Sequence, residues 1–511
     1  MGFAGLVSRA QLGVDAPPVT IEVYLSGGLP VYSIVGLPET AVRESKDRVR
    51  SAILSAGFDF PQRRITVNLA PADMRKSGGR YDLAIALGIL AAGNQVPAAA
   101  LAGLEFFGEL SLDGRLRRVP GILPAAVRAA AAGHALVVPA DNAQEAALAA
   151  DRVHPAGSLA EVTAHLHGVA ALPALSRCTP APLAVAGREL SDVRGQARAK
   201  RALEIAAAGG HNLLLVGPPG TGKSMLAERL PGLLPPLSEA EALETAAIDS
   251  VLGLPVDPLR WRQRPFRAPH HTATAAALVG GGSDPRPGEI SRAHNGVLFL
   301  DELPEFSRHV LEVLREPLES GRTTISRARA QAEFPARFQL VAAMNPCPCG
   351  YLGDPGASCN CSADRVAAYR ARISGPLLDR IDIRLDVPRP DLRLLRAARP
   401  DGESSARVAA RVAAARERQL QRAGCCNACL PAARLDRDCR GEPAAERLLD
   451  RAAQRERLSA RAYQRMRKLA RTIADLEGSL AIREQHLAEA LALRGGAGAA
   501  HGTLAWRQSG R

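Results

Sequence analysis

The chain has 511 residues, of which 47% are hydrophobic, 23% are charged and only 4% are aromatic. These values are typical of a globular protein of about two to four domains, and so few aromatic residues argue against long ladders of bases stacked on rings. The formal net charge of +13 favours a polyanionic partner, nucleic acid first, although arginines spread evenly over a solvated surface would give the same total.

The first ten residues contain no basic segment followed by an apolar core, and no run of about eighteen apolar residues occurs anywhere in the chain. We therefore expect no secretory signal and no membrane partner. Nine cysteines without such a signal favour a reducing compartment over a framework of disulfides. The predicted location is cytoplasmic.

Residues 1–170 are predicted to form one α/β domain. Alternating or continuous apolar runs indicate its strands, and apolar residues at helical spacing indicate its helices. The predicted strands are 21–25, 31–35, 65–69 and 134–138, the predicted helices are 40–56 and 81–92, and a hairpin at 110–116 is expected to turn at Asp113–Gly114.

Two segments of this domain, NLAPADMRKSGGRYDLAIALG (68–88) and GELSLDGRLRRVPGILPAA (108–126), resemble the Lon-protease-like fold, of ribosomal S5 type, as it occurs in magnesium-chelatase-related proteins. The resemblance implies a serine and lysine pair in peptidases of this fold, with the lysine just after the hairpin. Residues 120–133 contain no lysine, and Lys76 is poorly placed to activate its neighbour Ser77. We therefore do not expect a peptidase.

Residues 171–188 are rich in proline and alanine and are predicted to form a linker. An ATP-hydrolysing core is expected at 189–387, beginning with a short segment around Val193 and a helix that runs to about residue 208. This helix leads directly into the stretch that dominates the sequence.

That stretch is a phosphate-binding loop. An apolar strand ends at Val216, glycine and proline residues follow, and a helical pattern begins at Lys223, which is the context that the G-x-x-x-x-G-K-[ST] motif requires. Backbone N–H groups and the helix N-terminus would surround the phosphates of ATP, Lys223 would reach the β- and γ-phosphates, and Ser224 would ligate Mg²⁺. The predicted nucleotide-binding residues are Gly217, Pro218, Pro219, Gly220, Thr221, Gly222, Lys223 and Ser224.

Two further strands are predicted to deliver polar side chains to the same site. The apolar run 296–300 ends at Asp301 and Glu302, as a buried parallel strand does at an active site. Asp301 would hold the Mg²⁺, and Glu302 would act as general base on the attacking water. The strand 338–344 ends at Asn345, which could orient that water.

Two loops between these strands are candidates for contact with DNA. His270–His271 is interpreted as a DNA-binding or relay element, or as a purely structural pair. Residues 321–334 are predicted to form two short strands around a turn, in which Arg327 and Arg329 would contact phosphates without reading base sequence. The alternative is an exposed hairpin whose charges only aid solubility.

Cysteines follow Asn345 in two C-x-C pairs. Four thiolates could close a tetrahedral zinc site, while four free, reduced cysteines are the alternative. The residues concerned are Cys347, Cys349, Cys359 and Cys361. A second group has looser spacing and no nearby histidine, so we expect it to bind no metal; it comprises Cys425, Cys426, Cys429 and Cys439.

The remainder of the chain is predicted to form a helical lid at 388–494 and a flexible tail at 495–511. Apolar residues at helical spacing occur at 444–476 and 482–493, and arginines follow one side of 406–423. Just before the lid, the segment 374–383 carries Arg380, which could stabilise charge on a transferred phosphoryl group or belong to a surface cluster of charges.

Four motifs resemble magnesium-chelatase-like AAA+ ATPases, and within them the ComM, or YifB, group. They are RPFRAPHHTATAAALVGGG (264–282), PGEISRAHNGVLFLDELPEF (287–306), SGPLLDRIDI (374–383) and LSARAYQRMRKLARTIADLEG (458–478). The resemblance implies a parallel-sheet AAA+ P-loop core with a helical lid. It implies an adenine contact at Val193, a first sensor at Asn345, an arginine finger at Arg380 acting on an adjoining subunit, and a cis-acting second sensor at Arg461.

The same resemblance implies a homo-oligomer, a hexameric ring that acts as a DNA helicase on single-stranded or branched DNA. Its role would be branch migration when incoming DNA recombines during natural transformation. Two alternatives remain at this point: a chelatase-like motor whose ATPase activity is indifferent to DNA, and a protein-remodelling or proteolytic machine that unfolded protein would stimulate.

Overall fold

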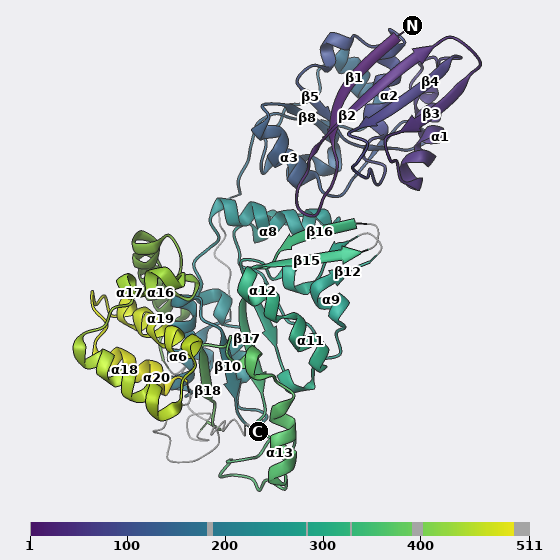
Figure 1. The fold of residues 1–511 in the computed structure, drawn as a ribbon. Helices are drawn as coiled ribbons and strands as arrows, with labels where there is room; N and C mark the ends of the chain where they lie inside the picture. The colour runs from purple at the N-terminus through teal and green to yellow at the C-terminus, as the bar shows by residue number, and fades with distance from the viewer. Residues whose placement is uncertain (1, 181–187, 283–284, 328–329, 391–401, 495–511) are drawn as a thin grey trace.

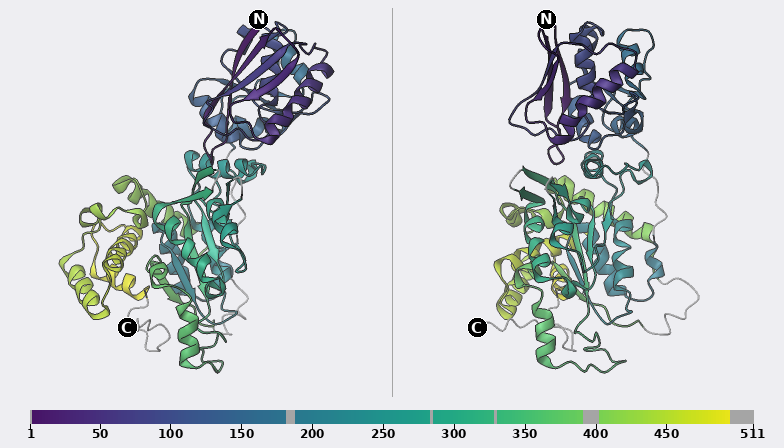
Figure 2. Two further views of the ribbon diagram at one scale, coloured as in Figure 1. Left: turned by 45° about the vertical axis from the view of Figure 1, so that its right-hand side comes forward. Right: turned by 90° about the vertical axis from the view of Figure 1, so that its right-hand side faces the viewer.

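The computed structural model describes residues 2–180, 188–282, 285–327, 330–390 and 402–494. It is an α/β protein with two mostly parallel sheets and a C-terminal helical region (Figure 1). The N-terminal unit lies at one end of the molecule, and the helical region lies beside the second sheet (Figures 1 and 2).

The N-terminal unit is a seven-stranded sheet covered by helices. Its strand order is β3-β4-β2-β1-β5-β8-β9, with antiparallel pairing of β1 with β2 and of β2 with β4, and parallel pairing elsewhere. The strands are β1 (Gly2–Arg9), β2 (Pro18–Ser26), β3 (Val31–Val35), β4 (Arg64–Ala70), β5 (Leu104–Phe106), β8 (Ala135–Pro139) and β9 (Val153–Ala156).

Helices of this unit pack on the sheet according to their apolar content. Every residue of α2 (Asp82–Ala92) is buried, because its sequence is apolar on all sides, whereas α1 (Thr40–Ser55) buries one face only. The predicted hairpin is present as β6 (Glu109–Leu110) and β7 (Leu116–Arg117). Strand β1 was not predicted.

The second sheet has five parallel strands in the order β11-β14-β17-β10-β18. They are β10 (Leu213–Val216), β11 (Phe266–Arg267), β14 (Val297–Leu300), β17 (Gln339–Met344) and β18 (Ile383–Asp386). All residues of the three central strands β10, β14 and β17 are buried. Because parallel strands end at the same edge of a sheet, the residues that follow these three strands come together.

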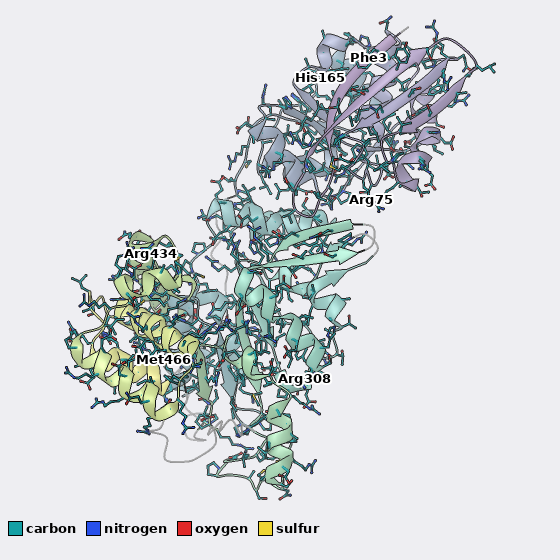
Figure 3. All side chains as sticks on the ribbon, viewed as in Figure 1. Phe3, Arg75, His165, Arg308, Arg434 and Met466 are labelled. Carbon is teal, nitrogen blue, oxygen red and sulfur yellow. The ribbon has the colours of Figure 1, made fainter. Side chains whose placement is uncertain are left out.

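The C-terminal region consists of helices that pack against the second sheet. They are α16 (Ser405–Ala423), α17 (Leu435–Asp438), α18 (Pro443–Glu456), α19 (Ala460–Leu476) and α20 (Glu484–Ala492). The apolar pattern predicted over 444–476 is divided between α18 and α19, because Arg457 adopts a left-handed conformation and Ser459 caps α19. Met466 lies fully buried among these helices (Figure 3).

A buried polar network fixes the helical region to the sheet. His211, just before β10, lies 2.8 Å from the Thr472 hydroxyl of α19 and 3.3 Å from the Asp382 carboxylate. Arg465 of α19 donates to Asp382 at 2.5 Å. Burial alone would raise the pKa of Asp382, but Arg465 and His211 outweigh it and hold the pKa well below its usual value.

The N-terminal unit contacts the second unit through α8 (Glu239–Val251) and a hairpin of β15 (Arg322–Arg327) and β16 (Ala330–Pro335). The N–H groups of Gly121 and Leu123 donate to the carbonyl and hydroxyl oxygens of Ser250, at 2.8 and 3.2 Å. Val14, in an N-terminal turn, packs against the apolar cluster that contains Ile325 and Phe334 of the hairpin. The hairpin is therefore held between the two units.

The predicted linker begins as an ordered segment. Leu175 exchanges backbone hydrogen bonds with Val153 at 2.8 and 3.0 Å, and the N–H of Cys178 donates to the Ala147 carbonyl at 2.9 Å. The remainder of the linker at 181–187, and the predicted tail at 495–511, lie outside the described residues. Among the helices of the described residues, none combines the length and apolar character needed to span a membrane.

Candidate nucleotide site

The phosphate loop joins β10 to α7 (Lys223–Ala227) and is shaped by its glycines. A Cβ on Gly217 would lie 2.2 Å from the Val387 carbonyl, so only glycine fits there. Gly220 and Gly222 have positive φ angles of 77° and 89°, with open space where a Cβ would project. These two glycines let the loop adopt left-handed backbone angles that other residues rarely adopt.

Lys223 is buried at the centre of the site. Its ammonium donates to the Gly217 and Pro218 carbonyls at 2.7 and 2.8 Å, and to Oδ1 of Asn345 at 3.2 Å. Burial lowers the pKa of Lys223, and the nearby carboxylates of Asp301 and Glu302 oppose this shift. A bound anion would favour the charged lysine further.

Ser224 and Asp301 form the pair expected for a magnesium site. The Ser224 hydroxyl donates to Oδ2 of Asp301 at 2.6 Å, which brings two hard oxygen ligands together from α7 and from the end of β14. The donors around the loop and this oxygen pair fit ATP and Mg²⁺: cationic and N–H groups would face the phosphates, and a hydroxyl and a carboxylate would face the metal.

Glu302 occupies a strained position beside Asp301. Its φ angle is 52°, and its own N–H donates to Oδ1 of Asp301 at 2.9 Å. The Glu302 carboxylate lies 3.1 Å from Nδ1 of His271, and 53% of its side chain is exposed. The ring of His271 packs against that of His270 in a tilted arrangement, with centroids 4.1 Å apart and 33° between the ring planes.

The sequence interpretation of His270–His271 as a DNA-binding or relay element missed this contact with Glu302. His271 follows β11, the edge strand next to β14, and β11 pairs with β14 in parallel register. That pairing brings the histidine loop to the carboxyl end of β14. The two residues are 31 positions apart in the chain, so no local pattern indicated the contact.

Val193 lies near the phosphate loop but inside the core. It is 4% exposed and belongs to the apolar cluster that joins the sheet to the helical region. The nearby Gln196 side chain donates to the carbonyls of Thr221 and Pro388, at 3.4 and 2.6 Å, which ties this segment to the loop. Contact of Val193 with adenine stays a prediction.

Arg380 and Arg461 meet at a different place. Arg380 follows α14 (Gly375–Leu378) and is buried, with an ion pair to Glu319 and a 2.7 Å hydrogen bond to the Pro376 carbonyl. Arg461, in the first turn of α19, also pairs with Glu319, at 3.3 Å. Arg461 therefore shares a carboxylate with Arg380, the predicted arginine finger, and does not contact the phosphate loop of its own chain.

The four cysteine side chains predicted as zinc ligands converge. The Sγ atom of Cys347 lies 3.3 Å from that of Cys349 and 3.7 Å from that of Cys359, and the last two are 3.5 Å apart. All four sulfur atoms, including that of Cys361, lie within 4.8 Å of one another. A Cβ on Gly350 of this loop would lie 2.8 Å from Pro219, so the cysteine loop touches the phosphate loop.

The predicted DNA hairpin is present as the paired strands β15 and β16. Arg327 ends β15, and Arg329 lies outside the described residues. The strands pair in register, and Arg322 and Glu333 form an ion pair across them at 2.5 Å. Ile325 and Phe334 are buried, which anchors the base of the hairpin.

Comparison with known proteins gives matches along most of the chain. The family models described as "Magnesium chelatase, subunit ChlI", "Subunit ChlI of Mg-chelatase" and "Magnesium chelatase, subunit ChlI C-terminal" match residues 189–394, 21–142 and 402–494.

Individual relatives match over nearly the full length. Competence protein ComM of Haemophilus influenzae is 50% identical over 499 residues, which cover 97% of this chain and 98% of that protein. Uncharacterized protein YifB of Salmonella typhimurium is 51% identical over 496 residues, or 97% of both chains. YifB of Escherichia coli is 51% identical over 502 residues, again 97% of both.

Proposed function

The chain belongs to the ComM/YifB group of the magnesium-chelatase-like AAA+ family, and from this premise we propose that it is an ATP-hydrolysing ring motor that acts on DNA. The observation that carries the ATPase proposal is the convergence of Lys223, Ser224, Asp301, Glu302 and Asn345 at the carboxyl edge of one parallel sheet. Within one chain, these residues supply every group that phosphoryl transfer to water requires except one. The missing group is a cation on the side of the γ-phosphate that faces away from the phosphate loop.

The proposed roles follow from the contacts. In the structure, the Lys223 ammonium donates to two loop carbonyls and to Oδ1 of Asn345. When ATP binds, the ammonium would turn from the carbonyls to the phosphate oxygens and keep its contact with Asn345. Bound Mg²⁺ would neutralise charge on the phosphates, held by Ser224 and Asp301. Glu302 would accept a proton from water, and its half-exposed carboxylate can reach solvent.

The missing cation is proposed to come from a neighbouring subunit. Arg380 and Arg461 are paired with each other through Glu319 and not with the phosphate loop of their own chain. We therefore assign both to the nucleotide of an adjoining copy in a homo-oligomer, in place of the cis role that the resemblance implies for Arg461. A head-to-tail interface of this kind closes into a ring, for which we propose six subunits.

DNA is proposed as the substrate on three grounds. The Haemophilus influenzae relative is named a competence protein, the net charge is +13, and the hairpin of β15 and β16 lies where the two units meet (Figure 1). The finer proposal is branch migration of recombining DNA during natural transformation, with Arg327 and Arg329 contacting phosphates.

The test is the ATPase rate with and without single-stranded and branched DNA across a salt series. We expect stimulation that weakens steeply as salt rises, because phosphate contacts release counterions. A rate that no DNA changes at any salt concentration would refute the DNA motor while leaving the ATPase intact.

A second candidate function is a chelatase-like motor that remodels a metal-insertion partner. The descriptions of all three matching family models favour it, since each names magnesium chelatase. It predicts an ATPase that is indifferent to DNA, so the same experiment separates the two candidates. A proteolytic machine finds no support, because Lys76 is buried and donates to the Pro71 carbonyl. The N-terminal unit would then be a Lon-protease-like domain without peptidase activity.

We also propose that the four-cysteine cluster binds Zn²⁺. In a tetrahedral site with Zn–S distances of about 2.3 Å, the sulfur atoms lie roughly 3.8 Å apart. The distances of 3.3, 3.7 and 3.5 Å among three of the thiols are close to that value. Because the cluster follows Asn345 and touches Pro219, the metal would stiffen the loop beside the nucleotide.

A further inference from the structure

We propose that Glu319 is a positioning residue that gathers Arg380 and Arg461 into one cationic pair and presents the pair to the nucleotide of the neighbouring subunit. This inference rests on the shared nucleotide site proposed above. Glu319 itself would touch neither the nucleotide nor the reacting water.

The contacts of a single carboxylate oxygen carry the inference. Oε1 of Glu319 forms an ion pair with Nη2 of Arg380 and another, at 3.3 Å, with Nη2 of Arg461. The two arginines come from different parts of the chain, one after α14 and one at the start of α19. Two guanidinium groups this close would repel each other without an anion between them. Glu319 is that anion.

The two arginines are held to different degrees. The Arg380 side chain is 5% exposed and has a second acceptor in the Pro376 carbonyl, whereas its Nε atom is buried without a hydrogen-bond partner in the part of the chain that the structure describes. The Arg461 side chain is 62% exposed. Arg380 is therefore a fixed cation, and Arg461 is a mobile one that Glu319 keeps beside it.

The surroundings of the pair leave room for an incoming ligand. Arg380 and Glu319 line a cavity of about 360 Å³, and 49% of the Glu319 side chain is exposed. Nε of Arg380 is buried behind this surface and has no hydrogen-bond partner among the described residues. A phosphate oxygen of a neighbouring subunit could reach the arginines from this side.

Glu319 also connects the pair to the hairpin proposed to contact DNA. It lies near the end of α12 (Arg315–Ser320), and Gly321 alone separates this helix from β15. A shift of the hairpin would therefore move Glu319, and with it both arginines. This gives DNA a short route to the nucleotide site of the next subunit.

The matched variants are Glu319→Gln and Glu417→Gln. Glu319 pairs with Arg380 and Arg461, whereas Glu417 is exposed on α16 and accepts from the Gln421 side chain, outside the cavity. We expect Glu319→Gln to lower the ATPase rate roughly ten- to a hundredfold, the scale of a displacement of about 1 Å in a catalytic group, with ATP affinity unchanged. Glu417→Gln should retain the full rate. An unaltered rate in Glu319→Gln would overturn the inference.

A mixing experiment separates positioning from damage to the fold. Glu302→Gln subunits lack the base but carry intact arginines, and Glu319→Gln subunits carry an intact base. Mixed in equal amounts, they should recover about a quarter of the wild-type rate, because each site takes its two halves at random from neighbours in the ring. Arg380→Ala mixed with Glu302→Gln is the reference.

Each outcome of the mixing experiment is decisive. Recovery in both mixtures supports Glu319 as a positioning residue acting across the interface. Recovery with Arg380→Ala but not with Glu319→Gln overturns the role of Glu319 and leaves the shared site standing. No recovery in either mixture overturns the shared site itself, and the inference with it.

Discussion

The two halves of the proposed catalytic machinery are built differently. The half around Lys223 and Asp301 arises from the ends of buried parallel strands, and its contacts of 2.6–3.2 Å are made within one sheet edge. The half around Arg380 joins a loop and a lid helix through one half-exposed carboxylate, that of Glu319. The first half draws its contacts from one chain, whereas we propose that the second half acts on the nucleotide of an adjoining copy.

This difference suggests why such a protein would assemble. Rigid strand ends suit the binding of a nucleotide, and a joint between a loop and a lid suits a contact that must form and break during a cycle. The predictions that follow challenge each half separately.

The largest effect is expected for Arg380→Ala. A finger that stabilises charge on the transferred phosphoryl group is worth about a thousandfold or more in turnover. The rate of ATP hydrolysis by assembled protein should fall by that amount, while equilibrium binding of a fluorescent ATP analogue stays near the wild-type value. Loss of binding in step with the rate would mean that Arg380 belongs to the fold and not to catalysis.

Glu302→Gln should follow closely, with a drop in turnover of roughly a hundred- to a thousandfold. A general base contributes about this much, and glutamine keeps the size of the side chain without its basicity. Single-turnover hydrolysis measures the chemical step directly. Retained hydrolysis would remove Glu302 as the base and shift attention to Asn345.

For the cysteine loop we expect a smaller effect. Cys347→Ser should release the metal and lower the ATPase rate roughly tenfold, since it loosens the loop that follows Asn345 and contacts Pro219. Metal analysis of the purified protein should give one zinc per chain in wild type and none in the variant. The matched control is Cys178→Ser, an exposed cysteine far from the cluster. Zinc-free protein of full activity would refute the site.

The smallest effect concerns the contact between His271 and Glu302. His271 holds the Glu302 carboxylate at 3.1 Å. Because a half-exposed contact of this kind contributes at most about 1 kcal/mol, releasing Glu302 by His271→Ala should raise the ATPase rate measured without DNA no more than about fivefold. His270→Ala is the control, because its ring nitrogen lies 2.9 Å from the Thr272 hydroxyl and not beside Glu302. A rate that falls in His271→Ala would show that the histidine supports the base instead of restraining it.

Much of the half around Lys223 and Asp301 was predictable from the sequence. The glycine spacing of the phosphate loop, and apolar runs that stop at Asp301 and Asn345, are local patterns with a direct structural meaning. Strand β3 occupies the predicted residues 31–35, and helix α1 differs from the prediction by one residue at its end. The cysteine spacing likewise indicated a cluster that the structure brings together.

The pairing of Glu319 with Arg380 and Arg461 was not predictable in the same way. Glu319, Arg380 and Arg461 are far apart in sequence; motifs indicate the two arginines, but no local pattern distinguishes Glu319 from an ordinary surface charge. The pairing of His271 with Glu302 depends on the parallel register of β11 and β14, which no local pattern specifies. Strand β1 was missed because its short alternation, beginning at Gly2, carries little apolar weight.

The central claim, that each nucleotide site is shared by two copies of the chain, is tested most directly by the ATPase rate per subunit as a function of protein concentration, with DNA present. We predict that the ATPase rate per subunit rises steeply with protein concentration and levels off where sedimentation detects the ring. The reason is that, in this proposal, Arg380 and Arg461 of each chain serve the nucleotide site of an adjoining copy. A constant rate per subunit from the monomeric range upward would contradict the account.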